Sequence, residues 1–570
     1  MNLEIARIFY EMADILEMQN VEWKPRAYRK AAKAIESLPI EVDEIYKKEG
    51  IDGLKKIPGV GERLAKKIEE YIKTGKISEY EELKKSLPRG LEKLLEIPGL
   101  GPKKIMVLYK KLGVKSIEDL KRVIEEGKVA RLPGFGEKSQ ENILRGIEIF
   151  ERGQERLLLS TAINISNEII NELKSVGGVE KIEAVGSLRR MKETVGDIDI
   201  LVVAKDPMKV MNKFTSLKNV ERVLAKGEKK SMVILSGNIQ ADVRVFNKDE
   251  FGAALQYFTG NKEHNIELRK IAISKGYKLN EYGLFKGNKK IAGEDEKKIY
   301  EILVSNYIPP ELRENRGEIK AAIENKLPKL VEMKDIKGDF HVHTKYSDGD
   351  DTIEEIARAA MKNYEFINIC DHSKSQHVAN GMEEERLLKQ IDEIKSLRKK
   401  LKFNIFAGCE VDILKNGELD YEDEILKKLD IVTVAVHSGF KMSEKEMTER
   451  IITALNNKHV KIFTHPSGRL INKRLPYQVN MEKIFEVAKK NKIALEIDAF
   501  PDRLDLTDVN VKLAKEMGIK ITIGTDAHSA TQLHYMNLGV AVARRGWAEK
   551  KDIINCWEIE KIKEYFGISS

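Results

Sequence analysis

The alternation of apolar and polar positions divides the chain into three stretches with different predicted secondary structure. Up to residue 152, apolar residues recur at helical spacing in charged segments such as GERLAKKIEEYIKTGK, which predicts amphipathic helices. In the middle stretch, segments such as DIDILVV alternate as half-buried strands do. Beyond residue 337, short apolar runs are separated by helical patterns such as TIEEIARAAMKN, which predicts a parallel α/β barrel.

Length and composition exclude several classes of protein. A chain of 570 residues is too long for one domain, and we expect three or four. Three cysteines among 34% charged residues are typical of a reduced, intracellular protein without a disulfide framework. The N-terminus does not have the pattern of a signal peptide, and no run reaches the roughly 18 apolar residues of a membrane span. We therefore expect a cytoplasmic protein that does not contact membranes.

Charge and histidine content change at the boundary between the middle and last stretches. The net charge is +8, and the excess of basic residues lies before residue 341, which favours a polyanionic partner there. Of the 10 histidines, only His264 precedes residue 341. Two kinds of chemistry are therefore expected on one chain.

A Pro-Gly-x-Gly turn recurs three times, with a period of about forty residues. After each turn a helix begins with unpaired N–H groups, which suit a phosphate oxygen. A single copy would serve equally well as a tight connection between helices. Three copies followed by basic helices favour contact with nucleic acid, and they resemble helix-hairpin-helix motifs, which grip a nucleic-acid backbone. The expected DNA-binding glycines are Gly59, Gly61, Gly99, Gly101, Gly134 and Gly136.

Two aspartates in the middle stretch point to a divalent metal. Asp197 and Asp199 lie two residues apart on a predicted strand, so their carboxylates project from one face and repel each other unless a cation separates them. A predicted hairpin brings Asp242 onto a strand that can neighbour them. Three carboxylates can hold two Mg²⁺ ions for in-line phosphoryl transfer. An Asp-x-Asp pair alone would fit an exposed strand end equally well.

The residues that precede these aspartates favour the catalytic interpretation. Gly186 lets the backbone approach a phosphate, Ser187 can donate a hydrogen bond, and Arg190 can bind phosphate oxygens. Together, the segments GSLRR, GDIDI, DVRV and ALQYFTG resemble the family X DNA polymerases, and the likeness covers residues 1 to about 315. One departure is Gln240, where the animal enzymes carry an arginine.

The resemblance implies addition of deoxynucleotides at short gaps, with gapped or primed DNA and deoxynucleoside triphosphates as substrates. Asp197, Asp199 and Asp242 would then be the catalytic metal ligands. Nucleotide-binding residues by the same match are Gly186, Ser187, Arg190, Tyr257, Phe258, Gly260, Asn265 and Arg269.

The N-terminal match also implies a 5′-deoxyribose-phosphate lyase site. It places Lys67 at the position of the lyase nucleophile, with Lys24, Tyr28 and Arg63 in a 5′-phosphate pocket. A lysine forms a Schiff base only when its surroundings lower its pKa. A basic helix that only binds backbone phosphates would carry the same residues.

Ligand-like side chains follow one apolar run after another in the last stretch. Because catalytic groups of a barrel lie at the C-terminal ends of its strands, these side chains should meet at one rim, where a metal would stabilise them. Asp371 follows one such run as well. The ligand-like side chains include His341, His343, Asp348, His372, Glu410, His437, His465, Asp526 and His528.

The motifs HVHTKYSDG, CDHS, GCEVDI, VHS, THPSGR and TDAHS resemble the polymerase-and-histidinol-phosphatase (PHP) domain over residues 338–570. The resemblance implies a distorted (β/α)7 barrel that holds up to three Mn²⁺ or Zn²⁺ ions and hydrolyses phosphoesters. By the same match, the expected ligands are His341, His343, Asp348, His372, Glu410, His437, His465, Asp526 and His528, with Glu410 as the bridge between ions. A 3′-5′ exonuclease or an abasic-site endonuclease activity would follow.

The expected fold class is multidomain, α + α/β. The predicted domains are a helical lyase-like domain with a helix-hairpin-helix (1–85), a helical DNA-binding domain with two such motifs (86–152), a polymerase-β-like nucleotidyltransferase palm with a mixed sheet (153–250), a thumb that binds the nascent base pair (251–317), a linker (318–337) and the PHP phosphoesterase (338–570).

We expect a monomeric, bifunctional DNA repair enzyme: a gap-filling polymerase fused to a phosphoesterase. One alternative is a polymerase whose PHP region is only structural, although its ligand set is intact. Another is a DNA-end scaffold with two vestigial sites, which the three palm carboxylates disfavour.

Overall fold

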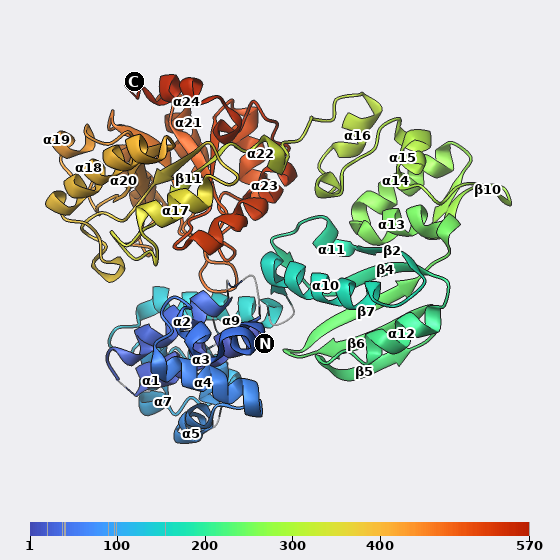
Figure 1. Ribbon diagram of the computed structural model, residues 1–570, viewed down its shortest axis with the longest axis horizontal. Helices are drawn as coiled ribbons and strands as arrows, with labels where there is room; N and C mark the ends of the chain where they lie inside the picture. The colour runs from blue at the N-terminus through green and yellow to red at the C-terminus, as the bar shows by residue number, and fades with distance from the viewer. Residues whose placement is uncertain are drawn as a thin grey trace. The chain divides into compact units, whose positions relative to one another are not determined.

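The computed structural model describes residues 1–568 except 20, 37, 39–40, 89, 96, 98–99 and 154–155, so Gly99 lies outside the described residues. The chain forms two compact units (Figure 1). The first contains residues 1–154 with 469–476 and 529–532, and the second contains the rest. Among the described residues, no helix is both long and apolar enough to cross a membrane.

Helices build the first unit around two apolar cores. One core is formed by residues such as Phe9, Met12 and Ile68, and the other by residues such as Ile105 and Leu120. The helices of the first core are α1 (Asn2–Met18), α2 (Lys24–Glu36), α3 (Val42–Lys55), α4 (Glu62–Thr74) and α5 (Ser78–Ser86); those of the second are α6 (Leu91–Leu94), α7 (Pro102–Leu112), α8 (Ile117–Glu125) and α9 (Gly136–Gly153).

A five-stranded mixed sheet forms the palm of the second unit. Its strand order is β2-β4-β7-β6-β5, and only β4 and β7 pair in parallel. Helices α10 (Leu159–Lys174) and α12 (Pro207–Thr215) pack against each other and against this sheet. The strands are β2 (Val179–Ala184), β4 (Ile198–Ala204), β5 (Val220–Lys226), β6 (Lys230–Leu235) and β7 (Ile239–Val245); β1 (Leu157–Leu158) pairs with β3 (Thr194–Val195) beside α11 (Gly186–Arg189).

The thumb follows the palm and has its own apolar core around Leu268, Tyr300 and Leu303. Its elements are η1 (Lys248–Glu250), α13 (Phe251–Thr259), α14 (Lys262–Ser274), a small antiparallel sheet of β8 (Lys278–Asn280), β9 (Gly283–Lys286) and β10 (Lys289–Ala292), α15 (Glu296–Val304), η2 (Pro310–Leu312) and α16 (Glu318–Ile323).

Seven parallel strands in sequential order form the C-terminal barrel. A bridge between Val342 and Ala527 joins the first and last strands, so the barrel is nearly closed. The strands are β11 (Gly338–Val342), β12 (Phe366–Ile369), β13 (Asn404–Asp412), β14 (Ile431–Ala435), β15 (Val460–Phe463), β16 (Ala494–Asp498) and β17 (Ile521–Gly524). Nearly all of their residues are buried, as expected of apolar runs covered on both faces.

Amphipathic helices alternate with these strands. They are α17 (Ile353–Ala360), α18 (Glu384–Leu401), α19 (Asp423–Leu426), α20 (Glu444–Leu455), α21 (Met481–Lys490), α22 (Asp508–Glu516), α23 (Met536–Arg545) and α24 (Ile559–Phe566); short 3-10 turns are η3 (Met333–Asp335), η4 (His377–Ala379), η5 (Ala530–Tyr535) and η6 (Ile554–Cys556). The helical first unit, the mixed palm sheet and this barrel confirm the expected fold class.

A buried ionic cluster ties the palm to the thumb. Glu296, at the start of α15, accepts hydrogen bonds from Arg189 at 2.9 and 2.8 Å and from the fully buried Arg313 at 2.6 Å. Burial raises the pKa of Glu296, but Arg313 and Arg189 outweigh it and lower that pKa from 4.5 to about 2. Folding is therefore linked to ionisation of this carboxyl group.

We predict that Glu296→Ala lowers the free energy of unfolding by about 3–5 kcal/mol, because two buried guanidinium groups lose their counter-ion. In the wild type, the contribution of Glu296 is fully present above pH 4.5 and is lost as the pH falls towards 2. Urea denaturation at pH 7 and at pH 3 measures both effects. The control is Glu301→Ala on the same helix, whose side chain is 55% exposed. Equal unfolding midpoints for the two variants would contradict the prediction.

Candidate active sites

Strand pairing brings the three palm aspartates together. Asp199 on β4 lies directly opposite Asp242 on β7 in the parallel register, and Asp197 precedes β4 by one residue. Gly186, at the start of α11, approaches the same group with a φ of +68°, and a Cβ there would lie 3.4 Å from the Asp199 carboxylate. A side chain at this position would crowd the carboxylates, so glycine keeps this approach open.

The palm aspartates repel each other strongly. Burial, followed by the charges of Asp197 and Asp242, raises the pKa of Asp199 from 3.8 to about 7. Lys230 lies 2.9 Å and Arg244 3.6 Å from the Asp242 carboxylate. Clustered carboxylates, of which Asp199 has a raised pKa, are the donor set that a hard divalent cation fits.

Gln240 occupies the position where the sequence departs from the animal enzymes, and it also reaches this group. Its Nε2 donates to Asp242 Oδ1 over 3.1 Å. The amide therefore contacts the third aspartate without adding a charge, whereas Lys230 and Arg244 supply positive charge from the neighbouring positions.

Several of the expected nucleotide-binding residues lie close together. Arg190 donates to the carbonyl oxygen of Thr259 and, over 3.0 Å, to Glu314. A Cβ on Gly260 would lie 3.4 Å from the Arg190 guanidinium, so the two positions are neighbours. Ser187 lies within the one-turn helix α11 that separates Gly186 from Arg190.

The remaining expected nucleotide-binding residues lie on α13 and α14. The rings of Tyr257 and Phe258 are 5.1 Å apart, and the Arg244 guanidinium lies 4.7 Å from the Phe258 ring. Asn265 donates to the Tyr257 carbonyl oxygen and accepts from Gln256, both over 2.7 Å. Asn265 therefore fixes the backbone of the aromatic pair, while Arg269 is half-buried one helical turn further along α14.

In the barrel, the expected ligands lie at or just beyond the carboxyl ends of their strands, as this architecture requires. Three groups of these side chains have ligand atoms within 4.8 Å of one another. The groups are His343, Asp348, His372 and His528; His341, His343 and Asp526; and His372, Glu410 and His437.

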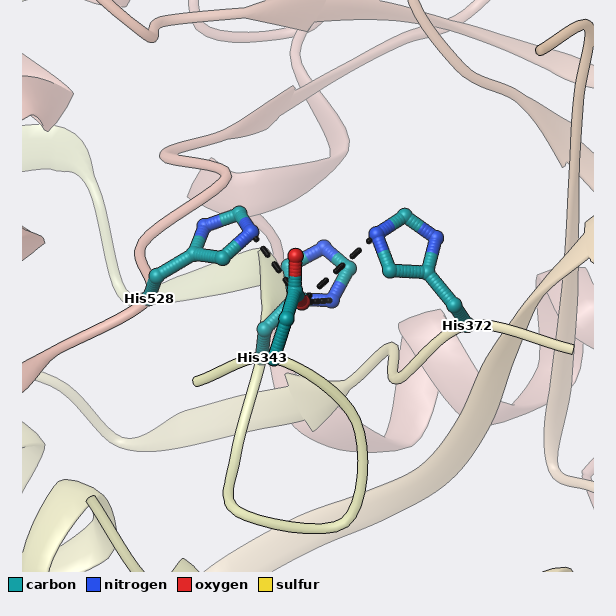
Figure 2. A group of neighbouring side chains, drawn as sticks. His343, His372 and His528 are labelled. Atoms are coloured by element: carbon teal, nitrogen blue, oxygen red, sulfur yellow. Dashed lines mark ion pairs between the residues drawn. The ribbon is translucent and has the colours of Figure 1, made fainter. Parts of the chain in front are cut away.

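The first group surrounds one carboxylate oxygen. Figure 2 shows the rings of His343, His372 and His528 turned toward a common point. Ring nitrogens of these residues lie 3.9, 3.7 and 3.3 Å, respectively, from Asp348 Oδ1.

The second group joins the first through His343. Its Nε2 lies 3.0 Å from both His341 Nε2 and Asp526 Oδ1. One imidazole therefore contributes to two groups.

Glu410 lies among five imidazoles, and the most distant contact joins its Oε2 to His343 Nε2 over 3.7 Å. Its Oε1 is 3.1 Å from His437 Nε2 and 2.7 Å from His465 Nε2, while its Oε2 is 2.9 Å from His372 Nδ1. His341 Nε2 is 3.6 Å from Oε2. Both carboxylate oxygens thus face imidazole nitrogens. Through its contact with Glu410, His465 also lies beside the third group.

Several ring nitrogens at the barrel rim are buried and make no hydrogen bond, which also fits a metal site. Among the described residues, the buried atoms without a hydrogen bond include His343 Nδ1, His372 Nδ1, His437 Nε2 and His465 Nδ1. Buried polar atoms are otherwise nearly always satisfied, so imidazole nitrogens facing carboxylates in this way are suited to a cation.

Carboxylates that sequence reasoning missed orient these imidazoles. Glu496 accepts from His341 Nδ1 over 3.0 Å, and Asp412 from His437 Nδ1 over 2.7 Å. Such contacts fix the orientation and tautomer of a ligand. Asp412 follows Glu410 by two residues on β13, which places both on one face, and this spacing was a usable signal. Glu496 lies inside the apolar run of β16, and the sequence has no comparable signal for it.

Two further residues at the rim have roles that spacing does not reveal. Asp371 does not join the ligand groups: its carboxylate accepts from Thr344 N over 2.7 Å and from Ser347 N over 3.1 Å, which holds the loop that carries Asp348. Arg503 lies 3.3 Å from Asp526 Oδ2 and places a positive charge beside that ligand.

In the first unit, two of the expected lyase residues, Lys67 and Tyr28, contact one carboxylate. Lys67 pairs with Glu79, which also accepts from the Tyr28 hydroxyl over 3.2 Å. The Lys67 side chain is 18% exposed, whereas Lys24 and Arg63 are exposed. Lys67 is therefore held in an ion pair with Glu79.

The described glycines of the repeated turns lie before helix N-termini or in left-handed turns. Gly61 and Gly101 are the N-cap residues of α4 and α7. Gly59, Gly134 and Gly136 have positive φ angles. The exposed first turns of α4 and α7 are thus placed as a phosphate contact requires.

Family models match successive parts of the chain. They are the helix-hairpin-helix domain (residues 1–77), the SAM-like helix-hairpin-helix tandem (91–148), the DNA polymerase beta palm (160–251), the DNA polymerase beta thumb (254–314) and the PHP domain (339–500).

Curated relatives match the whole chain or one end of it. The chain is 38% identical to the DNA polymerase/3′-5′ exonuclease PolX of Bacillus subtilis (strain 168) over 99% of this chain and 98% of that protein. It is 27% identical to DNA polymerase lambda of Arabidopsis thaliana over 55% of this chain and 62% of that protein. A probable phosphatase of Thermoanaerobacter sp. (strain X514), Teth514_1060, is 32% identical over 40% of this chain and 93% of its own length.

We predict that Glu410→Gln reduces Mn²⁺ binding to the barrel by at least about tenfold, because one charge shared by several imidazole groups is removed. Isothermal titration of the chelator-treated protein with Mn²⁺ measures the affinity. The matched control is Glu422→Gln, at the exposed N-cap of α19 on the same barrel. The prediction fails if Glu410→Gln and the control bind Mn²⁺ alike.

Proposed function

This chain belongs to the family X DNA polymerases that carry a C-terminal PHP domain, and from this we propose that it is a bifunctional DNA repair enzyme. It fills short gaps in DNA with deoxynucleotides and degrades DNA from the 3′ end. The observation that carries the proposal is that two separate sets of metal-ligating side chains converge on one chain. In the palm, strand pairing joins Asp199 to Asp242, and Asp197 precedes the same strand close enough to act on Asp199. The histidine-rich set meets at the barrel rim.

In the palm, the three aspartates would hold two Mg²⁺ ions. When bound, these ions lower the pKa of the primer 3′-hydroxyl and stabilise the pyrophosphate that leaves. Burial, with the charges of Asp197 and Asp242, raises the pKa of Asp199 to about 7, so a bound cation would favour the ionised form of this carboxyl group.

The loop after Gly186 would bind the incoming triphosphate. Arg190 is fixed through Nε and Nη1 by Glu314 and Thr259, which directs its guanidinium beside Gly260. Ser187 and the N-terminal amides of α11 supply further donors. Tyr257 and Phe258, whose rings meet edge to face, would line the sugar, and Asn265 holds the Tyr257 backbone in place. Arg269 would approach the template side.

In the barrel, the nine ligands would hold up to three Mn²⁺ or Zn²⁺ ions. When bound, the ions activate a water and neutralise the phosphate oxygens of the scissile bond. Glu410 is suited to link ions because both of its oxygens face imidazoles. Glu496 and Asp412 hold His341 and His437 in orientation. Arg503 would attract the phosphate from the rim.

The first unit would hold the DNA. The exposed turns that begin at Gly61, Gly101 and Gly136 would bind backbone phosphates without reading bases. We assign the lyase-like domain to residues 1–85, the second helix-hairpin-helix domain to 86–152, the palm to 153–250, the thumb to 251–317, the linker to 318–337 and the phosphoesterase to 338–570.

The test uses one 5′-phosphorylated, single-nucleotide-gapped DNA, incubated with Mn²⁺ with or without deoxynucleotides. We predict that Asp199→Asn lowers nucleotide addition by at least about 10³-fold and leaves 3′ degradation intact, because it removes one metal-binding charge from the palm alone. Asp526→Ala should do the reverse. Product lengths on a sequencing gel measure both activities in each variant.

Each outcome separates the proposal from its alternatives. Unchanged degradation by Asp526→Ala would show that the barrel is structural and that the protein is a polymerase alone. Unaltered gap filling by Asp199→Asn would overturn the polymerase assignment. Exposed Asp206→Asn, the N-cap of the neighbouring α12, is the matched control for the palm variant.

A lyase step at Lys67 would complete repair at an abasic site. We predict that borohydride traps a covalent adduct between the wild type and DNA with a 5′-deoxyribose phosphate, and that Lys67→Ala forms none. The neighbouring Lys66, which pairs with Glu62 at 2.9 Å, provides the control variant Lys66→Ala. Equal trapping in all three proteins would remove the lyase from the proposed function.

A further inference from the structure

The last residue of the barrel helix α23, Arg545, reaches into the polymerase half of the second unit. Its side chain is only 3% exposed. Its Nη1 donates to the main-chain oxygen of Arg190 over 2.7 Å and to Glu314 Oε1 over 3.0 Å. Its Nη2 donates to Asp508, on the adjacent barrel helix α22, over 2.6 Å. One side chain of the barrel thus contacts both the palm and the thumb.

Glu314 stands between two guanidinium groups. Its Oε1 accepts from Arg190 Nε and from Arg545 Nη1, each over 3.0 Å, and its Oε2 accepts from Asn261 over 3.2 Å. The Glu314 side chain is 9% exposed and that of Arg190 is 12% exposed. At such depth, charge-assisted hydrogen bonds hold side chains in one geometry more firmly than surface pairs do.

The same region connects to the barrel through a second thumb arginine. Arg316 Nη1 lies 3.1 Å from Asp508, and the Lys512 ammonium donates to the Arg316 carbonyl oxygen over 3.0 Å. Asp508 therefore neutralises Arg545 and Arg316 together. The thumb segment that ends the polymerase half is held by charges of the barrel.

We propose that Arg545, although it belongs to the PHP barrel, is a positioning residue for nucleotide addition. It holds residues 186–190 of the palm, the triphosphate loop of the proposed function, through Arg190 and Glu314. This inference rests on the proposed polymerase function.

Two effects of Arg545 act in the same direction. The hydrogen bond to the Arg190 carbonyl fixes the end of the loop that begins at Gly186. The bond to Glu314 divides the negative charge of that carboxylate between two guanidinium groups, so Arg190 keeps more of its positive charge for a triphosphate. Without Arg545, the loop is less restrained and Glu314 neutralises Arg190 more completely. Both changes weaken binding of the incoming nucleotide.

The neighbouring Arg544 supplies a matched control. It lies on the same helix and also joins the barrel to other parts of the unit, donating to Glu311 over 2.8 Å and to the Val331 carbonyl oxygen over 2.9 Å. Both of these partners lie outside the palm. Replacing Arg544 therefore perturbs the same interface without releasing the triphosphate loop.

The experiment compares full-length wild type, Arg545→Met, Arg545→Lys and Arg544→Met. Steady-state filling of a single-nucleotide gap gives kcat and KM for the deoxynucleotide, 3′ degradation of single-stranded DNA reports on the barrel, and thermal unfolding reports on the fold. We expect Arg545→Met to raise KM for the nucleotide about tenfold with a smaller change in kcat. Arg545→Lys should recover part of this loss, since it keeps the charge but not the two-pronged geometry.

Arg544→Met should keep KM within about twofold of the wild type, and both Met variants should degrade single-stranded DNA at the same rate. Equal KM values for Arg545→Met and Arg544→Met would overturn the inference while leaving the proposed function intact. An increase in KM that appears only with an equal loss of degradation and thermal stability would show a structural role and also overturn it. If the wild type fills no gap, the proposed function fails, and the inference fails with it.

Discussion

Parallel pairing of neighbouring strands is the constraint from which both candidate sites follow. Side chains at the same level of adjacent parallel strands lie side by side, so Asp199 and Asp242 meet without either strand bending. The same rule, applied to seven strands in sequential order, gathers imidazoles and carboxylates from distant segments at one rim. Charges of one sign and bare ring nitrogens collected in this way are unfavourable by themselves. The sheet geometry therefore builds sites that divalent cations stabilise.

Buried ion pairs extend this arrangement beyond the sheets. Glu296 joins Arg189 of the palm to Arg313 of the thumb, and Glu314 joins Arg190 to Arg545 of the barrel. Each carboxylate contacts two guanidinium groups, so removal of one partner leaves an uncompensated charge. The adjacent Arg189 and Arg190 of the palm are thereby held by two different carboxylates, Glu296 and Glu314. This arrangement ties the palm segment that ends at Arg190 to a helix of the barrel, an element that a polymerase half alone would not contain.

The two candidate metal sites differ in the chemistry of their donor groups. The palm concentrates carboxylates, hard oxygen donors that suit Mg²⁺ and leave room for substrate phosphates. The barrel mixes imidazoles with carboxylates, a donor set that suits Mn²⁺ or Zn²⁺. An imidazole ligand has a second ring nitrogen that needs a hydrogen-bond partner, and a carboxylate ligand does not. Glu496 and Asp412 supply such partners in the barrel. The histidine-rich end of the chain reflects this difference in ligand chemistry.

Local pattern predicted the helical first stretch, the parallel α/β barrel and most of the side chains that converge, and the family resemblances added the palm and the thumb. The i, i+2 spacing of Asp197 and Asp199, the repeated Pro-Gly-x-Gly turns and the ligand-like residues after apolar runs are short-range signals, and periodicity assigns each to a face or an end of its element. Tertiary structure alone determined the partners of these residues. The pairs of Lys67 with Glu79, His341 with Glu496 and Arg190 with Arg545 join positions 12, 155 and 355 residues apart. No local spacing encodes such contacts, because they depend on how whole elements pack.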